Sequence, residues 1–220
     1  MSSQVVCISR SLAAGGEEVG QAVARGLGFR YIDEQIITRA ARQAQVDPKV
    51  VAATEQRKPL LKRIVDRLAS GYDLAGAVTM GTGVPLDAFR PGPLEGYAAT
   101  DEDLRVMIRA AIHEIATAGQ AVIVAHAASM ALAGMPDVLR VLITASADTR
   151  AQRLAAAQGV GVAEATAAIA TSDRERRDYF QRFYQIREEL PTHYDVVINT
   201  DALTAEQAVQ LIVSLAAGSA

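Results

Sequence analysis

The residues between positions 10 and 17 could together bind a phosphate group. In the stretch "SRSLAAGGEE", residues 9–18, a guanidinium, a hydroxyl and two consecutive glycines lie within a few positions of one another. Glycine lets the backbone approach an anion closely and permits positive φ, so that main-chain N–H groups can converge on it. The residues that we predict to contact phosphate here are Ser11, Ala13, Ala14, Gly15, Gly16 and Glu17.

The segments on either side of these residues predict a strand, a tight turn and a helix. Residues 5–8 form an apolar, β-branched run, and Val19 and Val23 continue at helical spacing after the glycines. The start of that helix would aim free N–H groups and a positive dipole end at an anion. However, Gly16 and Glu17 stand where an ordinary P-loop has lysine followed by serine or threonine.

Arg10, at the end of the first predicted strand, is the residue that we expect to replace the missing lysine. A cationic contact to transferring phosphate contributes on the order of several kcal/mol in the transition state. A structural salt bridge is the alternative role for Arg10. Glu17 and Glu18 suit the dipole at the helix start, and the alternative for such a carboxylate is to bind Mg²⁺.

A second basic group lies in "SDRERRDYFQRFYQIR", residues 172–187. It places Arg174, Arg176 and Arg177 within one helical turn, with Arg174 and Arg177 on a shared face. By composition alone, such a run is typical of a solvated helix surface. The aromatic residues that follow are expected to pack this helix on the core.

Four apolar runs predict buried parallel strands, at residues 5–8, 121–125, 139–144 and 196–199. The helices between them imply an α/β fold with a parallel sheet covered on both faces. His126 follows the second of these strands, at the edge where such sheets bind ligands. It is either a cation near phosphate or a structural histidine.

Capping patterns predict where three helices begin. Thr100 with Asp103, Ser146, and Thr204 with Gln207 each precede a helical pattern. Residues 34–70 are predicted to form consecutive helices, whereas residues 71–99, rich in glycine and proline, predict a long loop or an irregular insertion.

Length and composition limit the class of protein. A chain of 220 residues with 50% hydrophobic but only 5% aromatic residues suits one helix-rich α/β domain. A net charge of −3 gives no general attraction to nucleic acid, and no apolar run is long enough to cross a bilayer. We expect a cytoplasmic protein with no nucleic-acid or membrane partner, and a homo-oligomer is one of the assembly states that the sequence leaves open. The single cysteine, Cys7, is expected to be a small buried residue, and three scattered histidines predict no zinc site.

The order of several blocks resembles the cytidylate kinase-like family, relatives of the P-loop nucleoside monophosphate kinases. The blocks are "ISRSLAAGGEEVGQAVARGLGFRYIDEQII", "AVIVAHAASMAL", "DVLRVLITASADTRAQRL" and "DRERRDYFQRFYQ…YDVVINTDALTAEQAV". The resemblance extends from about residue 5 to residue 213. It implies a three-layer P-loop fold in one domain, with an acceptor flap within residues 34–100 and a lid within residues 160–190.

The resemblance also implies an activity and roles for individual residues. The expected reaction is phosphoryl transfer from ATP, with Mg²⁺, to a nucleoside monophosphate, with CMP or dCMP as the best guess. Substrate-binding residues would be Asp33, Arg39 and His126, and catalytic residues would be Arg10, Arg174 and Arg177. Two departures stand out: the loop lacks lysine, and His126 replaces an arginine. The alternative is therefore a nucleotide- or phosphate-binding pseudokinase with a regulatory or scaffolding role, and a structural oligomer is a third possibility.

Overall fold

The computed structural model describes residues 3–33, 101–125 and 127–218, except for the side chains of 101–105 and 107. The chain divides into two compact units, of which one comprises residues 1–34 and 116–220 and the other residues 35–115. The helices predicted within residues 34–70, the irregular segment 71–99, Arg39 and His126 lie outside the described residues.

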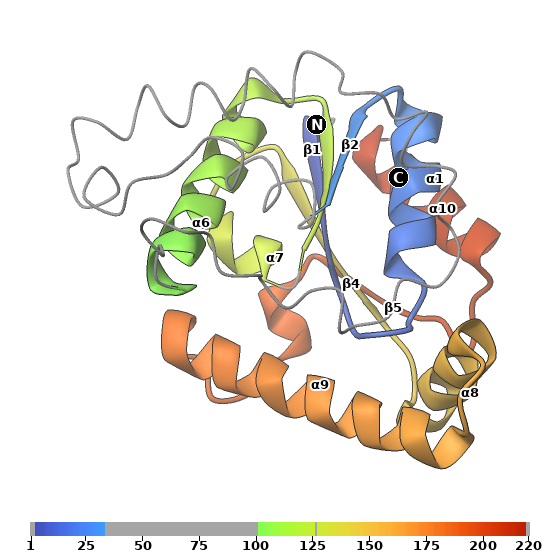
Figure 1. Ribbon diagram of the computed structural model, residues 1–220. Coiled ribbons are helices and arrows are strands. Elements are labelled where there is room, and N and C mark those ends of the chain that lie inside the picture. Colours follow the sequence, from blue (N-terminus) through green and yellow to red (C-terminus); the bar gives the residue numbers. More distant parts are fainter. Residues whose placement is uncertain (1–2, 34–100, 126, 219–220) are drawn as a thin grey trace, which may run out of the picture. The chain divides into compact units, whose positions relative to one another are not determined.

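The first unit is built on a five-stranded parallel sheet with the order β2-β3-β1-β4-β5 (Figure 1). The strands are β1 (Val5–Arg10), β2 (Arg30–Asp33), β3 (Ala121–Val124), β4 (Val138–Thr144) and β5 (Val196–Asn199). The four strands predicted from apolar runs are confirmed. β2 was not among them, because it has only four residues and a charged residue at each end.

The helices of the described residues follow the strands in alternation. They are α1 (Gly16–Leu27), α6 (Asp101–Ala118), α7 (Ala128–Ala131), α8 (Ala147–Gln158), α9 (Val162–Tyr184) and α10 (Ala205–Ala216), with a short 3₁₀ helix at Pro191–His193. The predicted starts at Ser146 and Thr204 are confirmed: the Ser146 side chain accepts from the Thr149 N–H, and Thr204 forms a capping box with Gln207.

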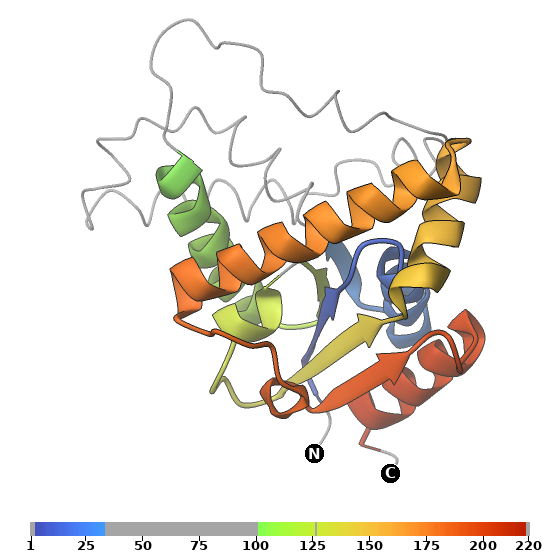
Figure 2. The same cartoon turned by 90° about the horizontal axis from the view of Figure 1, so that it is seen from below.

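Helices cover both faces of the sheet and give the three-layer α/β fold. One face packs against α1 and α10, where Val19, Val23 and Ile212 meet strand residues such as Ile8 and Val141 in a single apolar cluster. On the other face lie α7 and α9, as Figure 2 shows from below. Both faces of β1 are therefore buried, which explains its unbroken run of buried residues up to Ser9.

Close packing of α1 on β3 requires glycine at position 20. A Cβ atom there would lie 2.5 Å from Val124 Cγ2 and 3.3 Å from Tyr31 Cε2. We expect Gly20→Ala to lower the free energy of unfolding by about 1–3 kcal/mol in urea denaturation, because the added methyl overpacks this contact. Gly26→Ala is the matched control in the same helix: its Cβ would meet only Val213 Cγ2, at 3.2 Å. Equal losses in both variants would contradict this explanation.

Among the helices that the structure describes, none by itself has the length and apolar character to cross a membrane. The bent pair α8 and α9, at 118°, meets those criteria only when the two are taken together.

Candidate active site

A short loop at the carboxyl end of β1, residues 11–15, forms a turn, here called the phosphate loop. Two of its residues have left-handed backbone conformations, Ala13 with φ 60° and Gly15 with φ 84°. The Ala14 N–H donates to the Ser11 carbonyl oxygen at 3.1 Å, which closes the turn. Alternating right- and left-handed residues turn successive N–H groups toward one point, a geometry that binds anions.

The N-terminus of α1 adds further donors beside this loop. The first bond of the helix runs from the Val19 N–H to the Gly15 carbonyl oxygen, at 3.1 Å. The N–H groups of Gly16, Glu17 and Glu18 therefore have no acceptor within the helix. Free N–H groups at the positive end of a helix dipole fit a phosphate group.

Gly16 and Arg10 depend on one another. A Cβ atom at position 16 would lie 2.6 Å from Arg10 Cβ and 3.0 Å from Arg10 Cδ, so the arginine side chain crosses the space that any other residue would fill. The closest of these atoms is the Cβ of Arg10, so any side chain at position 16 would collide with residue 10 in this backbone. The sequence analysis expected both glycines to permit positive φ and a close approach of the backbone to an anion. Only Gly15 has positive φ, whereas Gly16 is required because the Arg10 side chain packs against it.

The Arg10 guanidinium forms an ion pair with Glu17 in the first turn of α1, through its Nε atom. The Arg10 side chain is only 13% exposed and Glu17 is 45% exposed, so the carboxylate lies on the solvent side of the pair. Arg10 thus lies against the loop, as expected of a cation that replaces lysine, and it also makes the salt bridge that was the alternative.

The phosphate loop is braced from β5 by a threonine that the sequence analysis did not single out. The Thr200 hydroxyl lies 3.0 Å from the Ala14 carbonyl oxygen, and Arg153 Nη1 donates to that hydroxyl at 2.9 Å. Ser11 adds a contact to β4, with its hydroxyl 3.4 Å from that of Thr144. Thr200 directly follows a predicted strand, and a polar residue at that edge is the signal that could have identified it.

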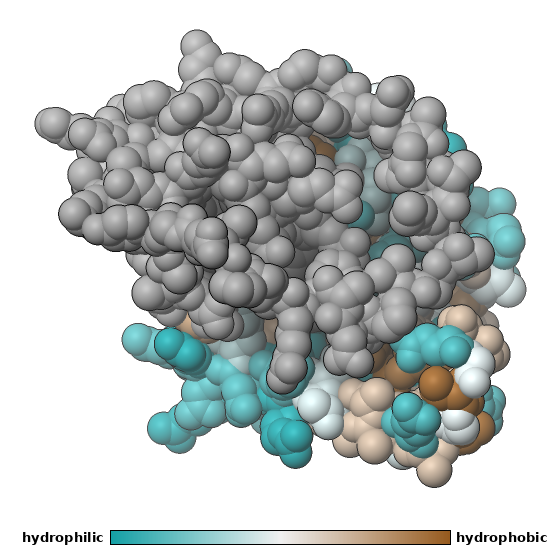
Figure 3. All heavy atoms as spheres, in the orientation of Figure 1, coloured by the Kyte–Doolittle hydropathy of each residue, from teal (hydrophilic) through white to brown (hydrophobic). Residues whose placement is uncertain are grey.

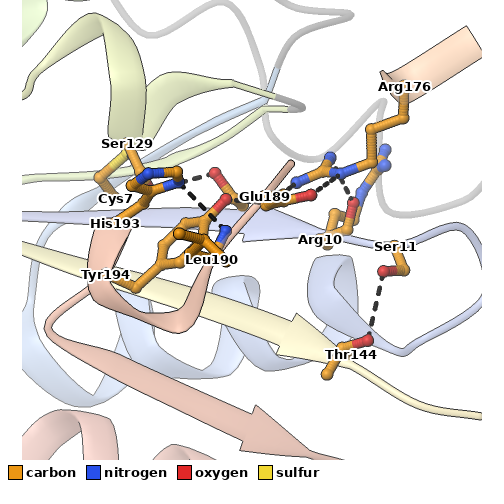
Figure 4. Close-up of polar contacts among 11 residues, drawn as sticks. Cys7, Arg10, Ser11, Ser129, Thr144, Arg176, Glu189, Leu190, His193 and Tyr194 are labelled. Atoms are coloured by element: carbon orange, nitrogen blue, oxygen red, sulfur yellow. Dashed lines mark hydrogen bonds and ion pairs between the residues drawn. The ribbon is translucent and has the colours of Figure 1, made fainter. Parts of the chain in front are cut away.

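Arg176 of α9 reaches the end of β1, directly before the phosphate loop. It is buried, and its Nη1 donates to the Arg10 carbonyl oxygen at 3.0 Å (Figure 4). Ala165, Ile169, Arg176 and Phe180 form the buried stripe of the helix. An arginine at an apolar position of a helical stripe is the sequence signal that would have separated Arg176 from its neighbours.

Arg174 and Arg177 lie on the exposed side of the same helix. Successive residues of a helix are about 100° apart, so these two side chains leave the axis in directions different from Arg176. Figure 3 shows hydrophilic surface around the C-terminal half of α9, whereas the corner between α8 and α9, with Val162 56% exposed, is apolar. The catalytic role of Arg174 and Arg177 stays a prediction.

A third buried arginine, Arg150, lies where α8 begins. Its Nη1 and Nη2 donate to both carboxylate oxygens of Asp173 on α9, at 2.9 and 2.7 Å, and its Nε donates to the Ala145 carbonyl oxygen. This bidentate pair joins α8 to α9.

The predicted acceptor residues are only partly described. Asp33 ends β2 and is in register with Val124 of β3, so it lies at the carboxyl edge of the sheet, as the phosphate loop does. The described residues contain no group of three or more His, Cys, Asp or Glu side chains that could hold a metal ion. A Mg²⁺ ion that substrate phosphates help to bind needs only one or two side-chain oxygens, which Ser11 of the phosphate loop and Glu17 of α1 offer.

Cys7 belongs to the structural interior. Its Sγ lies 3.7 Å from the Ser129 hydroxyl, which in turn lies 3.0 Å from that of Ser9. Burial raises the pKa of the Cys7 thiol to about 12, so it remains a neutral thiol. The expectation of a small buried residue is confirmed.

The sheet order, the glycine-containing loop after β1 and the helix that follows define the fold of P-loop kinases. The chain belongs to the cytidylate kinase-like family, whose model matches residues 5–202. No curated protein sequence matches the chain.

Two crystal structures share the fold. An uncharacterized protein from Eubacterium ventriosum ATCC 27560 has a TM-score of 0.65 at 15% identity, over 96% of this chain and 97% of that chain. Shikimate kinase from Bacteroides thetaiotaomicron has a TM-score of 0.52 at 17% identity, also over 96% and 97%. The family and the kinase-like fold support a nucleotide kinase-type function.

Proposed function

We propose that the protein transfers the γ-phosphoryl group of Mg·ATP to a nucleoside monophosphate, with CMP or dCMP as the acceptor. The observation that carries this proposal is the arrangement of Arg10 across Gly16, beside the free N–H groups of the phosphate loop and α1. A guanidinium there can supply the charge that lysine supplies in ordinary P-loops. Membership of the cytidylate kinase-like family supports the choice of acceptor.

Each group would have a simple task, because phosphoryl transfer depends on positioning and on charge stabilisation. Within residues 11–17, the N–H groups of Ser11 and Ala14 already donate to carbonyl oxygens, so the other N–H groups of this stretch would hold the donor phosphates. Arg10 would contact the phosphoryl group as it is transferred. Arg174 and Arg177, exposed on α9, are the cations that we assign to the transition state. Asp33, Arg39 and His126 would face the acceptor.

A bound Mg²⁺ would neutralise part of the phosphate charge. Glu17, in the first turn of α1, is the carboxylate that we assign as its ligand, and the same carboxylate is the partner of Arg10. A metal that draws Glu17 away would leave the Arg10 guanidinium available for phosphate.

One observation favours a second candidate, a nucleotide-binding pseudokinase. Three largely buried arginines around the loop each have a carboxylate partner: Arg10 with Glu17, Arg150 with Asp173, and Arg176 with Glu189. Pairing of this kind lowers the net positive charge that the described residues present to phosphate. A protein that binds nucleotide without transferring phosphate would tolerate such neutralisation.

A coupled assay for ADP formation with a panel of nucleoside monophosphates separates the two. We expect turnover with CMP or dCMP and a rise in melting temperature with Mg·ATP. ATP-dependent stabilisation without turnover of any acceptor would instead establish the pseudokinase. If the protein shows neither turnover nor stabilisation by ATP, both functions are contradicted and only the fold assignment stands.

A further inference from the structure

The carboxyl end of β1 extends beyond its neighbour on one side. Its pairing with β3 ends at Ile8, opposite Val124, and the last bond on this side runs from the Ala125 N–H to the Ile8 carbonyl oxygen. On the other side, pairing with β4 continues to Arg10, opposite Ile143. Carbonyl groups alternate in direction along a strand, so the Arg10 carbonyl points to the side where β3 has already ended.

Arg176 supplies the donor that β3 does not. Its Nη1 lies 3.0 Å from the Arg10 carbonyl oxygen. The Ser11 N–H belongs to the same peptide unit and donates to the Ile143 carbonyl oxygen at 3.1 Å. Because a peptide unit is planar, hydrogen bonds at both of its ends fix its orientation. The peptide between Arg10 and Ser11 is the first of the phosphate loop, so its orientation sets the direction in which the loop begins.

Arg176 is itself held by two residues that follow α9. Its Nε and Nη2 donate to the two carboxylate oxygens of Glu189, at 2.8 and 2.6 Å, and the Tyr194 hydroxyl donates to Glu189 as well. The Phe180 ring lies 4.8 Å from the guanidinium carbon. Figure 4 shows Glu189 between Arg176 and Tyr194, with Arg10 of β1 beside the guanidinium of Arg176.

The charges of this group are stable near neutral pH. Burial by itself would raise the pKa of Glu189, but the hydrogen bonds and charge of Arg176, with the Tyr194 hydroxyl, hold that pKa below its usual value. Burial, followed by the carboxylate of Glu189, raises the pKa of Tyr194. The carboxylate therefore stays ionised and the tyrosine stays a donor.

We propose that Arg176 is a positioning residue for the phosphate loop, and that Glu189 and Tyr194 hold it in place. We call the three residues the Arg176 latch. The inference rests on the proposed function only in taking the phosphate loop as the nucleotide site. The latch acts on nucleotide through the Arg10 carbonyl and the loop, without contacting the nucleotide itself.

Hydrogen–deuterium exchange of the nucleotide-free protein tests the latch without reference to activity. Glu189→Gln and Tyr194→Phe should each speed exchange in a peptide that covers residues 9–18 by about tenfold, because a hydrogen bond to a charged group is lost. Exchange in α10 should not change. Glu188→Gln is the matched control, since Glu188 is the adjacent carboxylate and is exposed.

A double variant separates positioning from simple stabilisation. Arg176→Met with Glu189→Met replaces a buried ion pair by apolar side chains of similar size, a change that can leave stability almost unaltered. We expect fast exchange of residues 9–18 to persist in it, with the dissociation constant for ATP raised about tenfold in calorimetry. Tyr194→Phe keeps the buried ring and provides the same test should the double variant fail to fold.

Exchange of residues 9–18 at the wild-type rate in a folded latch variant would overturn the proposal. This outcome is distinct from failure of the proposed function, in which the wild-type protein forms no ADP while the latch variants still exchange faster.

Discussion

Arg10→Ala is expected to reduce kcat for ADP formation by about 10²–10³-fold, the loss typical of removing one group that stabilises transition-state charge. The expectation follows from the position of the Arg10 side chain, which lies against Gly16 at the start of α1. Steady-state kinetics with Mg·ATP and the acceptor found in the panel measure the effect. Because the interaction is made most strongly in the transition state, kcat should fall more than the affinity for ATP.

Two variants sharpen this test. Glu17→Gln removes the carboxylate partner of Arg10 and, when Mg²⁺ is absent, should tighten the binding of free ATP, whereas Arg10→Ala should weaken it. Arg25→Ala, an exposed arginine in the last turn of α1, controls for loss of one positive charge and should leave kcat within about twofold. If Arg10→Ala and Arg25→Ala behave alike, Arg10 has only a structural role.

Replacing both Arg174 and Arg177 with alanine is expected to lower kcat by about 10³-fold or more, the size of the contribution that an arginine makes to phosphoryl transfer in related reactions. Both side chains are exposed on α9, so the melting temperature should change little. Parallel measurement of kcat and of thermal unfolding tests both statements.

Arg187→Ala is the matched control for this pair, because Arg187 is an exposed arginine just beyond the C-terminus of α9. Unchanged turnover in the double alanine variant would show that Arg174 and Arg177 do not stabilise the transition state. The exposed side of α9 would then be the solvated surface that its composition by itself suggests.

The parts of the fold that local patterns determine could be predicted. Apolar runs located four strands, and the side chains of Ser146 and Thr204 cap the helices that their positions indicated. β2 could not be found in this way, because its pairing with β3 rather than its own composition makes it a strand.

Parts of the candidate site that depend on local backbone conformation could be predicted from the sequence. Parts that depend on how side chains pack could be predicted less well. The glycines indicated the phosphate loop, and the position of Arg10 indicated its approach to that loop. Three arginines within one turn of α9 look equivalent in sequence, but the burial of Ile169 and Phe180 turns Arg176 toward the sheet. The partners Glu189 and Thr200 are distant in sequence from the loop residues that they influence, so no local pattern connects them.

α9 is an unbroken helix of 23 residues, about 34 Å long, and two residues near its middle, three positions apart, form ion pairs. Asp173 ties it to α8, and one turn later Arg176 ties it to the segment before β5. The N-terminal half of α9 also packs on α8, because Ala165 and Ile169 share an apolar cluster with Ala151 and Leu154. The ion pair and this cluster join the two helices, so a movement of α9 over a bound nucleotide would carry α8 with it.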